Sequence, residues 1–402
     1  MGKTVVGVAV LGCGVVGSGV VEMLTANQSV ISNAAGQDVR LMYIVDIRPV
    51  DAPAGVTVTK DLDAVLRDTQ VDIVAETIGG CNIAFDYTKR CLKAGKHVIT
   101  SNKELVVTHG EQLTALAQKN GVAYLYEASV CGGVPVLQPI RTALSGNRIE
   151  SLSGIVNGST NYLLSRMEQD DVSFSAALGE AKALGYVEAD PSADVDGHDA
   201  RRKLSILANT AFGAKFSDDS SIPTQGITRV TRRDMACAKM LNGNVKLVVH
   251  ARKTGGQWTG WVHPALAMES SPLYPVRDVF NALVIAGDCV GDVMVYGRGA
   301  GKLPTASALI GDLIEILNGN VSGQGRLNDA IDFVTPDDCI IKMAFRIEGE
   351  AADLPLPIEK TVSGDGMTAV MTKPCARGTL MKGYGEIIEK GLRCGIPLIV
   401  FQ

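Results

Sequence analysis

The stretch Val5–Gly17, with the sequence V-V-G-V-A-V-L-G-C-G-V-V-G, decides the fold at the start of the chain. Its first part, Val5–Leu11, is apolar without polar alternation, which predicts a strand buried on both faces of a parallel sheet. A Gly-x-Gly-x-x-Gly pattern follows, and the periodicity over Gly17–Leu24 predicts a helix. Glycines at this spacing permit a tight turn, close approach of a pyrophosphate and close packing of helix on strand. We therefore expect a dinucleotide-binding turn formed by Gly12, Gly14, Val15, Val16 and Gly17.

Strand and helix patterns alternate over residues 1–135. Further strands are expected at Arg40–Val45, Val71–Glu76, His97–Thr100 and Ala123–Glu127. Helices are expected at Leu62–Arg67, Ile83–Ala94 and Glu111–Asn120, and a polar loop around Ser29–Gln37. This alternation predicts an α/β, Rossmann-type doubly wound parallel sheet in a dinucleotide-binding domain, which we expect to be completed by about residues 300–320.

The pattern changes after residue 135. Helices are expected at Val134–Leu144, Thr160–Met167, Ser175–Leu184 and His198–Phe212, and strands at Ile149–Val156, Val245–Ala251, Val279–Ala286 and Val290–Val295. Strands without regular crossover helices predict an α+β domain with an open mixed or antiparallel sheet over residues 136–299. The run N-G-N-V-S-G-Q-G at 318–325 predicts a linker to a small α+β tail at 326–402. In that tail, strands are expected at Cys339–Ile347, Thr368–Thr372 and Ile396–Phe401, and a helix at Thr379–Leu392.

Composition excludes several classes of protein. The 402 residues carry a formal net charge of −5, which argues against a nucleic-acid partner. The nine cysteines form no C-x-x-C pair and the five histidines no H-x-x-x-H pair, so neither a disulfide framework nor a zinc site is expected. Glycines interrupt the apolar N-terminal stretch, and no other stretch is long enough for a membrane span. We therefore expect a cytoplasmic protein that has no membrane partner.

Two places at the predicted carboxyl edge of the parallel sheet carry charged residues. Asp46 ends the second strand, where an acidic residue binds the adenosine ribose and favours NAD. Arg48 follows two residues later and is able to pair with the 2′-phosphate of NADP, so the sequence favours NAD over NADP only slightly. Ser101 and Lys103 follow the fourth strand, where the lysine either meets substrate or cofactor or is a solvated loop residue.

The stretch from Gly185 to Lys203, G-Y-V-E-A-D-P-S-A-D-V-D-G-H-D-A-R-R-K, is rich in acidic residues and leads into a predicted helix. Asp199 and Lys203 are four residues apart and therefore share one face of that helix. The apolar run that follows indicates that the helix is largely buried. A lysine in that setting, flanked by carboxylates, is a candidate proton donor, although an exposed ion pair is the commoner meaning of this spacing.

Here the chain resembles the homoserine dehydrogenases, over roughly residues 4–320. The pattern that carries the resemblance is Ala181-x-x-x-Gly185-Tyr186, then Asp190-Pro191-x-x-Asp194-Val195-x-Gly197-x-Asp199-x-x-x-Lys203. Supporting stretches are E-A-S-V at 127–130, G-I-V-N-G-S-T-N-Y at 154–162, V-F-N-A at 279–282 and Y-G-R-G-A-G at 296–301. The resemblance implies NAD(P)-dependent interconversion of L-homoserine and L-aspartate 4-semialdehyde, in threonine and methionine biosynthesis.

The resemblance also assigns roles by position. Lys203 is similar to the family's catalytic lysine and Lys103 to a second active-site lysine. The implied substrate-binding residues are Glu188, Asp194, Asp199, Asn157, Thr160 and Tyr186, and the further cofactor-binding residues are Thr77, Ser101 and Gly301. A monovalent-cation loop for Na⁺ or K⁺ is implied at Glu127, Val130, Gly132 and Val134. A homodimer or homotetramer built through the second domain is implied as well.

The tail and two rival functions stay open at this point. The last strand, helix and strand resemble half of a ligand-sensing ACT domain, but the proline-bearing stretch 349–360 stands in place of its first helix. One rival function is a phosphorylating semialdehyde dehydrogenase with Cys131 as nucleophile, which would need a base such as the distant His263. The other is a non-catalytic NAD(P) sensor, although such a protein would not need Asp199 and Lys203 on the same face of one helix.

Overall fold

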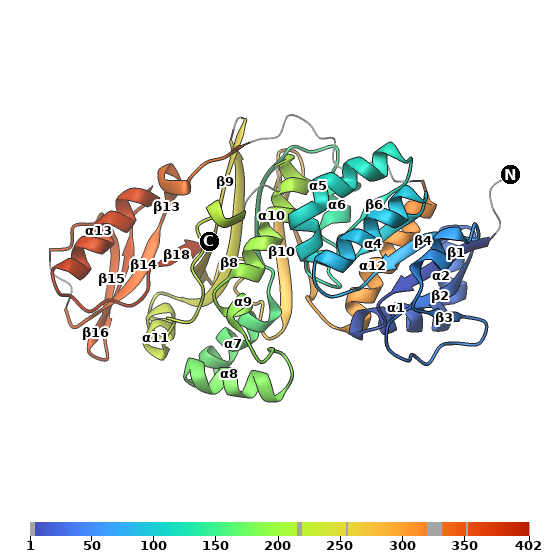
Figure 1. Cartoon of the computed structure of the whole chain (residues 1–402). Coiled ribbons are helices and arrows are strands. Elements are labelled where there is room, and N and C mark those ends of the chain that lie inside the picture. Colours follow the sequence, from blue (N-terminus) through green and yellow to red (C-terminus); the bar gives the residue numbers. More distant parts are fainter. Residues whose placement is uncertain (1–4, 215–218, 255, 320–331, 351–352, 402) are drawn as a thin grey trace. The chain divides into compact units, whose positions relative to one another are not determined.

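The computed structural model describes residues 5–214, 219–254, 256–319, 332–350 and 353–401 (Figure 1). The chain forms two compact units, and neither is one continuous stretch. The first unit combines 1–148, 205–219 and 297–331, and the second combines 149–204, 220–296 and 332–402. The boundary expected at residue 135 lies inside the first unit.

The first unit contains a six-stranded sheet in the order β3-β2-β1-β4-β5-β6. Every pairing is parallel, so this is the doubly wound sheet predicted from the sequence. Its strands are β1 (Val5–Leu11), β2 (Asp38–Val45), β3 (Thr57–Thr59), β4 (Val71–Glu76), β5 (His97–Thr100) and β6 (Tyr124–Leu125). The strand order reverses between β1 and β4, where open α/β sheets bind ligands at the carboxyl ends of their strands.

Helices cover both faces of this sheet. Alternate residues of β1, Val6, Val8 and Val10, share one buried apolar cluster with α1, α2 and α12. Helices α4 and α5 pack on each other; α4 contacts β4 and β5, and α5 contacts β6. The helices of this unit are α1 (Val15–Ala26), α2 (Gln28–Ala35), α3 (Leu62–Arg67), α4 (Asn82–Lys93), α5 (Lys103–Lys119), α6 (Leu137–Arg141) and α12 (Lys302–Leu317).

Helix α2 corrects the prediction of a polar loop around Ser29–Gln37. The segment has few apolar residues, but Ile31 and Ala35 lie one turn apart and are buried in the cluster under α12. Gly36 ends the helix with φ of 65°, a conformation that glycine adopts without strain. Tertiary burial of one narrow face therefore stabilises a helix that local periodicity did not indicate.

The second unit contains a ten-stranded mixed sheet, with β11-β10-β7-β8-β9-β18-β14-β16-β15 in order and β12 beside β9. Its strands are β7 (Ile149–Ile155), β8 (Gly243–Thr254), β9 (Gln257–Met268), β10 (Phe280–Gly287), β11 (Gly291–Arg298), β12 (Asp332–Phe333), β14 (Met343–Glu348), β15 (Ile358–Gly364), β16 (Met367–Thr372) and β18 (Leu398–Phe401). Its helices are α7 (Gly158–Gln169), α8 (Phe174–Ala183), α9 (Ser192–Val195), α11 (Arg232–Met240) and α13 (Arg377–Glu389). Helix α10 (His198–Phe212) begins in this unit and ends in the first.

Strand β9 was not expected, because Gly260 and Pro264 interrupt its apolar sequence. In the structure β9 pairs with β8 along its whole length, and both faces of the strand are buried. Pro264 lies opposite Leu247 in that ladder. Pairing with β8 therefore stabilises a segment whose own residues favour turns.

The tail continues the second sheet. Strand β18 pairs in parallel with β9 and antiparallel with β14, so residues near the C-terminus bridge the two parts of the sheet. Most of the linker expected at 318–325 lies outside the described residues, and β15 was not anticipated. The ACT-like interpretation of the tail stays a prediction. No helix in the described ranges is long and apolar enough to cross a bilayer.

Candidate functional site

The glycine turn after β1 is open where a phosphate would approach. Gly12 has φ of 84°, and a Cβ at Gly17 would lie 1.9 Å from the Gly12 carbonyl oxygen, so both positions require glycine. A Cβ at Gly14 would meet nothing within 4 Å. Gly14 is also the N-cap of α1 and provides no side-chain cap, which leaves the first N–H groups of that helix available to an anion. These residues fit a dinucleotide.

Thr77 joins the turn to the end of β4. Its backbone N–H donates to the Leu11 carbonyl at 2.9 Å, and its hydroxyl lies 2.5 Å from the Gly12 carbonyl oxygen. The carboxyl ends of β1 and β4 are thereby fixed side by side. The structure thus brings Thr77 together with the glycine turn.

Asp46 and Arg48 form a bidentate pair at the end of β2. Arg48 donates from Nε to Oδ1 at 3.1 Å and from Nη2 to Oδ2 at 2.9 Å. The same Oδ2 accepts the Cys13 N–H of the glycine turn at 2.7 Å. The hydrogen bonds from Arg48 hold the pKa of the Asp46 carboxyl well below its usual range. Asp46 therefore supports the glycine turn, and its negative charge is paired with that of Arg48, the residue whose charge favours NADP.

The loop after β5 lies at the same edge of the sheet. Asn102 is the N-cap of α5, because its side chain accepts the Leu105 N–H at 3.0 Å. Its Nδ2 donates to the carbonyls of Ile78 and Gly80 in the loop after β4. Lys103, the first residue of α5, is half-buried and follows directly.

Gly301 belongs to the first unit, although it lies far along the chain. It is the N-cap of α12 with φ of 128°, and the next residue, Lys302, pairs with Glu22 of α1. A Cβ at Gly19 would lie 2.6 Å from the Lys302 carbonyl oxygen, so α12 packs closely on α1. The structure therefore places Gly301 beside the helix that begins at the glycine turn.

In the second unit, four predicted residues form a connected cluster. Lys203 Nζ lies 2.7 Å from Asp199 Oδ2 and donates to the Val156 carbonyl at 2.9 Å. Asn157 Nδ2 donates to Asp199 Oδ2 at 2.8 Å and to Asp194 Oδ1 at 2.7 Å. Asp199 is buried and Lys203 is 13% exposed at the side chain. One cation and two carboxylates are thus held together by an amide at the start of α7.

The remaining predicted substrate residues differ in their surroundings. Thr160 is buried, and its N–H donates to Asn157 Oδ1 at 2.8 Å, which orients the amide. Tyr186 is 46% exposed and packs edge-on against Tyr162. Glu188 is exposed and makes no hydrogen bond or ion pair with another described residue. Thr160 is therefore hydrogen-bonded to the Lys203 cluster, whereas Glu188 makes no hydrogen bond or ion pair with a described residue of that cluster.

The segment predicted to hold a monovalent cation has an unexpected carboxylate geometry. Glu127 is buried, and its two carboxylate oxygens accept the N–H groups of Val136, Leu137 and Gln138 at the start of α6. Its carbonyl accepts the Val130 N–H, and the Val134 N–H donates to the Cys131 carbonyl. Gly132 has φ of 50° and packs against Gly299. Among the described residues, no group of histidine, cysteine, aspartate and glutamate is arranged to hold a metal.

Arg141, on α6, lies between three buried carboxylates, and the sequence did not predict this cluster. Its Nη2 is 3.0 Å from Glu315, 3.6 Å from Asp312 and 3.9 Å from Glu127. Burial raises the pKa values of Glu127 and Asp312. Their partners lie far apart in the chain, so no local pattern could have revealed this cluster.

Cys131, the rival nucleophile, is 1% exposed. It has φ of 56°, in the left-handed region, within the tight turn beside Gly132. A thiol this buried is poorly placed to attack a substrate, because a reactive thiolate needs access and a cationic field.

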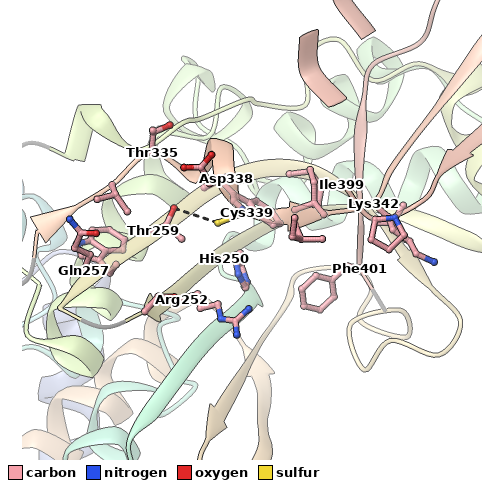
Figure 2. A pocket seen from close by; sticks show the side chains of 18 residues that line it. His250, Arg252, Gln257, Thr259, Thr335, Asp338, Cys339, Lys342, Ile399 and Phe401 are labelled. Atoms are coloured by element: carbon pink, nitrogen blue, oxygen red, sulfur yellow. Dashed lines mark hydrogen bonds between the residues drawn. The ribbon is translucent and has the colours of Figure 1, made fainter. Parts of the chain in front are cut away.

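The second unit also contains a pocket of about 900 Å³, between β8, β9 and residues 334–342 and 399–401 (Figure 2). His250 and Arg252 of β8 line it together with Trp258 and Trp261 of β9. Burial lowers the pKa of His250 to about 4, so the ring is neutral at pH 7, and its Nδ1 lies 2.8 Å from Ser153 Oγ. None of the predicted active-site residues lines this pocket.

A parallel sheet with an open glycine turn and a separate lysine–carboxylate cluster defines an NAD(P)-dependent dehydrogenase. Comparison with known proteins specifies the family. The NAD-binding domain of homoserine dehydrogenase matches residues 12–127, and the homoserine dehydrogenase domain matches residues 135–314. The chain belongs to the homoserine dehydrogenase family.

Individual relatives agree with this assignment. The chain is 37% identical to a homoserine dehydrogenase from Pseudomonas aeruginosa, over 84% of this chain and 75% of that protein. A crystal structure of a homoserine dehydrogenase from Thiobacillus denitrificans is similar with a TM-score of 0.89, at 30% identity, over 99% of this chain and 98% of that one. A hyperthermophilic archaeal homoserine dehydrogenase mutant in complex with NADPH is similar with a TM-score of 0.64, at 25% identity, over 77% and 97% of the two chains.

Proposed function

We propose that this chain interconverts L-homoserine and L-aspartate 4-semialdehyde with NAD(P), and that Lys203 carries the proton. The observation that supports this most strongly is the cluster of Lys203, Asp199, Asn157 and Asp194. Asp199 and the Val156 carbonyl orient Lys203 Nζ from two sides. A general acid or base needs that kind of fixed position, because proton transfer depends on hydrogen-bond reach to the reacting oxygen.

The reaction moves one hydride and one proton. When homoserine is oxidised, the hydride leaves its alcohol carbon for the nicotinamide ring, and the hydroxyl proton passes to Lys203 Nζ in its neutral form. In the reverse direction Lys203 returns that proton to the carbonyl oxygen. Asp199 stabilises the charged lysine, and Asn157 keeps Asp199 in place.

The substrate is a zwitterion and needs groups of both signs. In this proposal Glu188, Asp194 and Asp199 surround the substrate ammonium, and Tyr186, Thr160 and Asn157 complete the pocket. Lys103 positions the carboxylate or the reacting end. Thr160 contributes to the pocket indirectly, because its backbone N–H orients the Asn157 side chain.

For the cofactor, we propose that the glycine turn, Thr77, Ser101 and Gly301 bind NAD or NADP, with a slight preference for NAD from Asp46. Arg48 reduces that preference, because its pairing with Asp46 offsets the negative charge that would repel a 2′-phosphate. A monovalent cation at residues 127–134 would have to use backbone carbonyls, because amide N–H groups already occupy both Glu127 carboxylate oxygens. Activity measured with K⁺, Na⁺ and a bulky organic cation at equal ionic strength tests this site.

The assembly proposed is a homodimer or homotetramer built through the second unit. Val290, Met294 and Tyr296, in or beside edge strand β11, are exposed apolar side chains of the kind that a subunit interface covers. Light scattering coupled to size-exclusion chromatography measures the mass directly. A monomer at micromolar concentration would contradict the proposal.

The decisive experiment follows absorbance of the reduced nicotinamide with L-homoserine and either NAD or NADP, at alkaline pH and without phosphate. Reduction of the cofactor supports the proposed reaction, and the better cofactor resolves the opposition of Asp46 and Arg48. Reduction that occurs only with aspartate semialdehyde plus phosphate would move the chemistry to Cys131. No reduction under either condition, with cofactor still bound, would favour a sensor.

A further inference from the structure

Glu76 is the last residue of β4, and it is a fully buried carboxylate that the proposed mechanism does not use. It lies at the carboxyl edge of the sheet, immediately before Thr77. It is on the β4-β5-β6 side of the point where strand order reverses, the half of such a sheet that receives the nicotinamide end of a dinucleotide. A charged group in this place requires a reason, because burying a carboxylate is costly unless it is well hydrogen-bonded.

Both carboxylate oxygens of Glu76 accept hydrogen bonds from loops at this edge. Oε1 accepts the Ile78 N–H at 2.6 Å, from the loop after β4. Oε2 accepts the Thr100 hydroxyl at 2.6 Å, from the end of β5. The carboxylate therefore joins two neighbouring strand ends through side-chain contacts in addition to the sheet ladder.

Thr100 extends the connection towards α5. Its Oγ1 accepts the Asn102 N–H at 3.0 Å while its hydroxyl donates to Glu76. Asn102 in turn caps α5 and donates to the carbonyls of Ile78 and Gly80. The result is a closed set of contacts from Glu76 through Thr100 and Asn102 back to the loop after β4, with Lys103 as the next residue.

We propose that Glu76 is a positioning residue for the nicotinamide half of the cofactor site, which ties the loop after β4 to the Thr100–Asn102 turn and so holds Lys103 in place. This inference rests on the dehydrogenase function proposed above. Glu76 need not touch substrate or cofactor. It acts through Thr100 and Asn102.

The ionised form of Glu76 makes the stronger contacts. Hydrogen bonds to a carboxylate are about twice as strong as those between neutral groups. Burial raises the pKa of Glu76 to about 7, and the hydrogen bonds from Thr100 and Ile78 oppose that rise. The titratable groups that interact with Glu76 by charge are Tyr124 on β6, Cys81 before α4 and Cys91 in α4. All three are neutral at pH 7, and burial raises their pKa values further. The connection is therefore strongest above pH 7 and weakens as the pH falls below it.

Three variants test the proposal by calorimetric titration with NAD and NADH. Thr100→Val removes both bonds of the hydroxyl with little change of shape, and we expect the dissociation constant to rise about tenfold at pH 8. Thr100→Ser keeps the hydroxyl and is the matched control, with an affinity close to that of the parent chain. Glu76→Gln keeps the size of the side chain but removes its charge, and we expect weaker binding at pH 8. At pH 6, where most of Glu76 is protonated, we expect the difference from the parent chain to shrink.

The outcomes separate this role from a purely structural one. Urea unfolding of Glu76→Gln at pH 8 is the control, because weaker cofactor binding in a variant as stable as the parent chain cannot come from unfolding. If Thr100→Val fails to fold, Glu76→Gln and Thr100→Ser still decide the question. Equal affinities for the parent chain and Glu76→Gln at both pH values would overturn the proposal. A parent chain that binds neither NAD nor NADP would instead reject the dehydrogenase function itself.

Discussion

The Asp199 carboxylate and the Lys203 ammonium lie one helical turn apart on α10, with 2.7 Å between Oδ2 and Nζ. Pairs at this spacing on exposed helices contribute only about 0.3–0.5 kcal/mol. Here Asp199 is also bound by Asn157, and Lys203 also donates to the Val156 carbonyl, so neighbouring elements fix both side chains. The pair is therefore part of a positioned cluster that spans α10 and the start of α7.

Replacing Lys203 with alanine tests proton transfer. We expect turnover to fall by about 10²–10⁴-fold, the range attributed to a general acid or base. NADH affinity, measured by titration, is expected to stay near that of the parent chain, because the glycine turn lies in the other unit. Lys119→Ala, which removes an exposed lysine at the end of α5, is the matched control. Unchanged turnover in Lys203→Ala would remove it as the proton carrier.

Arg48 and Asp46 are expected to set cofactor preference in opposite directions. Arg48→Ala should lower kcat/KM with NADP more than with NAD, because it removes the cation beside a 2′-phosphate. Asp46→Asn should shift the ratio towards NADP, and its amide oxygen still accepts the Cys13 N–H that supports the turn. Steady-state kinetics with both cofactors provide the ratio. A ratio that stays constant in both variants would place specificity elsewhere.

Gly17→Ala should disrupt the cofactor site locally. The added Cβ would lie 1.9 Å from the Gly12 carbonyl oxygen and 2.7 Å from Thr77 Oγ1, so the turn must move. We expect cofactor affinity to fall by at least about tenfold, equivalent to 1.4 kcal/mol. Gly14→Ala is the informative comparison, because its Cβ meets no atom within 4 Å and any loss there reports directly on the space a ligand needs. Equal, small losses in both variants would argue against a phosphate at this turn.

The stability of Glu76→Gln relative to the parent chain should depend on pH. The folded-state pKa of Glu76 is raised from 4.5 to about 7, so between these values the folded protein binds the proton that the unfolded chain has released. The parent chain therefore loses stability, up to about 3 kcal/mol, as the pH rises through this window, and glutamine does not titrate. Urea unfolding of both proteins at pH 5 and pH 8 measures the difference. No change of the difference with pH would mean that Glu76 keeps an ordinary pKa.

Cys131→Ala should leave the homoserine reaction at its parent rate. The thiol is buried, and the proposed chemistry needs no covalent intermediate. Rates with and without added phosphate are the measurement, and alkylation of the parent chain is a further check. Loss of activity in folded Cys131→Ala would revive the cysteine mechanism.

The sequence predicted central strands better than peripheral elements. β1, β4 and β5 have the predicted bounds, because strands buried on both faces are continuous apolar runs. Helix α2 was missed because its buried face packs against residues distant in the chain, whereas β9 was missed because pairing with the adjacent strand β8 and with β18 stabilises residues that favour turns. Fold class therefore followed from local pattern, whereas the edges and additions to each sheet did not.

The candidate site divides in the same way. Gly12, Gly14 and Gly17 and the pair of Asp199 and Lys203 are local patterns with a direct physical meaning. The connection of Asn157 to both carboxylates is a tertiary contact, and the sequence suggested this residue only through the family resemblance. Glu76 was overlooked, although a charged residue that ends the apolar strand Val71–Glu76 is itself a detectable signal.

The discontinuous make-up of the two units limits how this enzyme can be re-engineered. Exchanging residues 1–148 for those of a relative, in order to transplant cofactor preference, would leave behind the 205–219 segment and α12, which belong to the same unit. Leu309, Ile310 and Leu313 of α12 fill the apolar cluster under β1, so a recombinant made in this way would combine mismatched halves of one core. A functional chimera has to take all three segments together, and point substitution is the simpler route to a new cofactor preference.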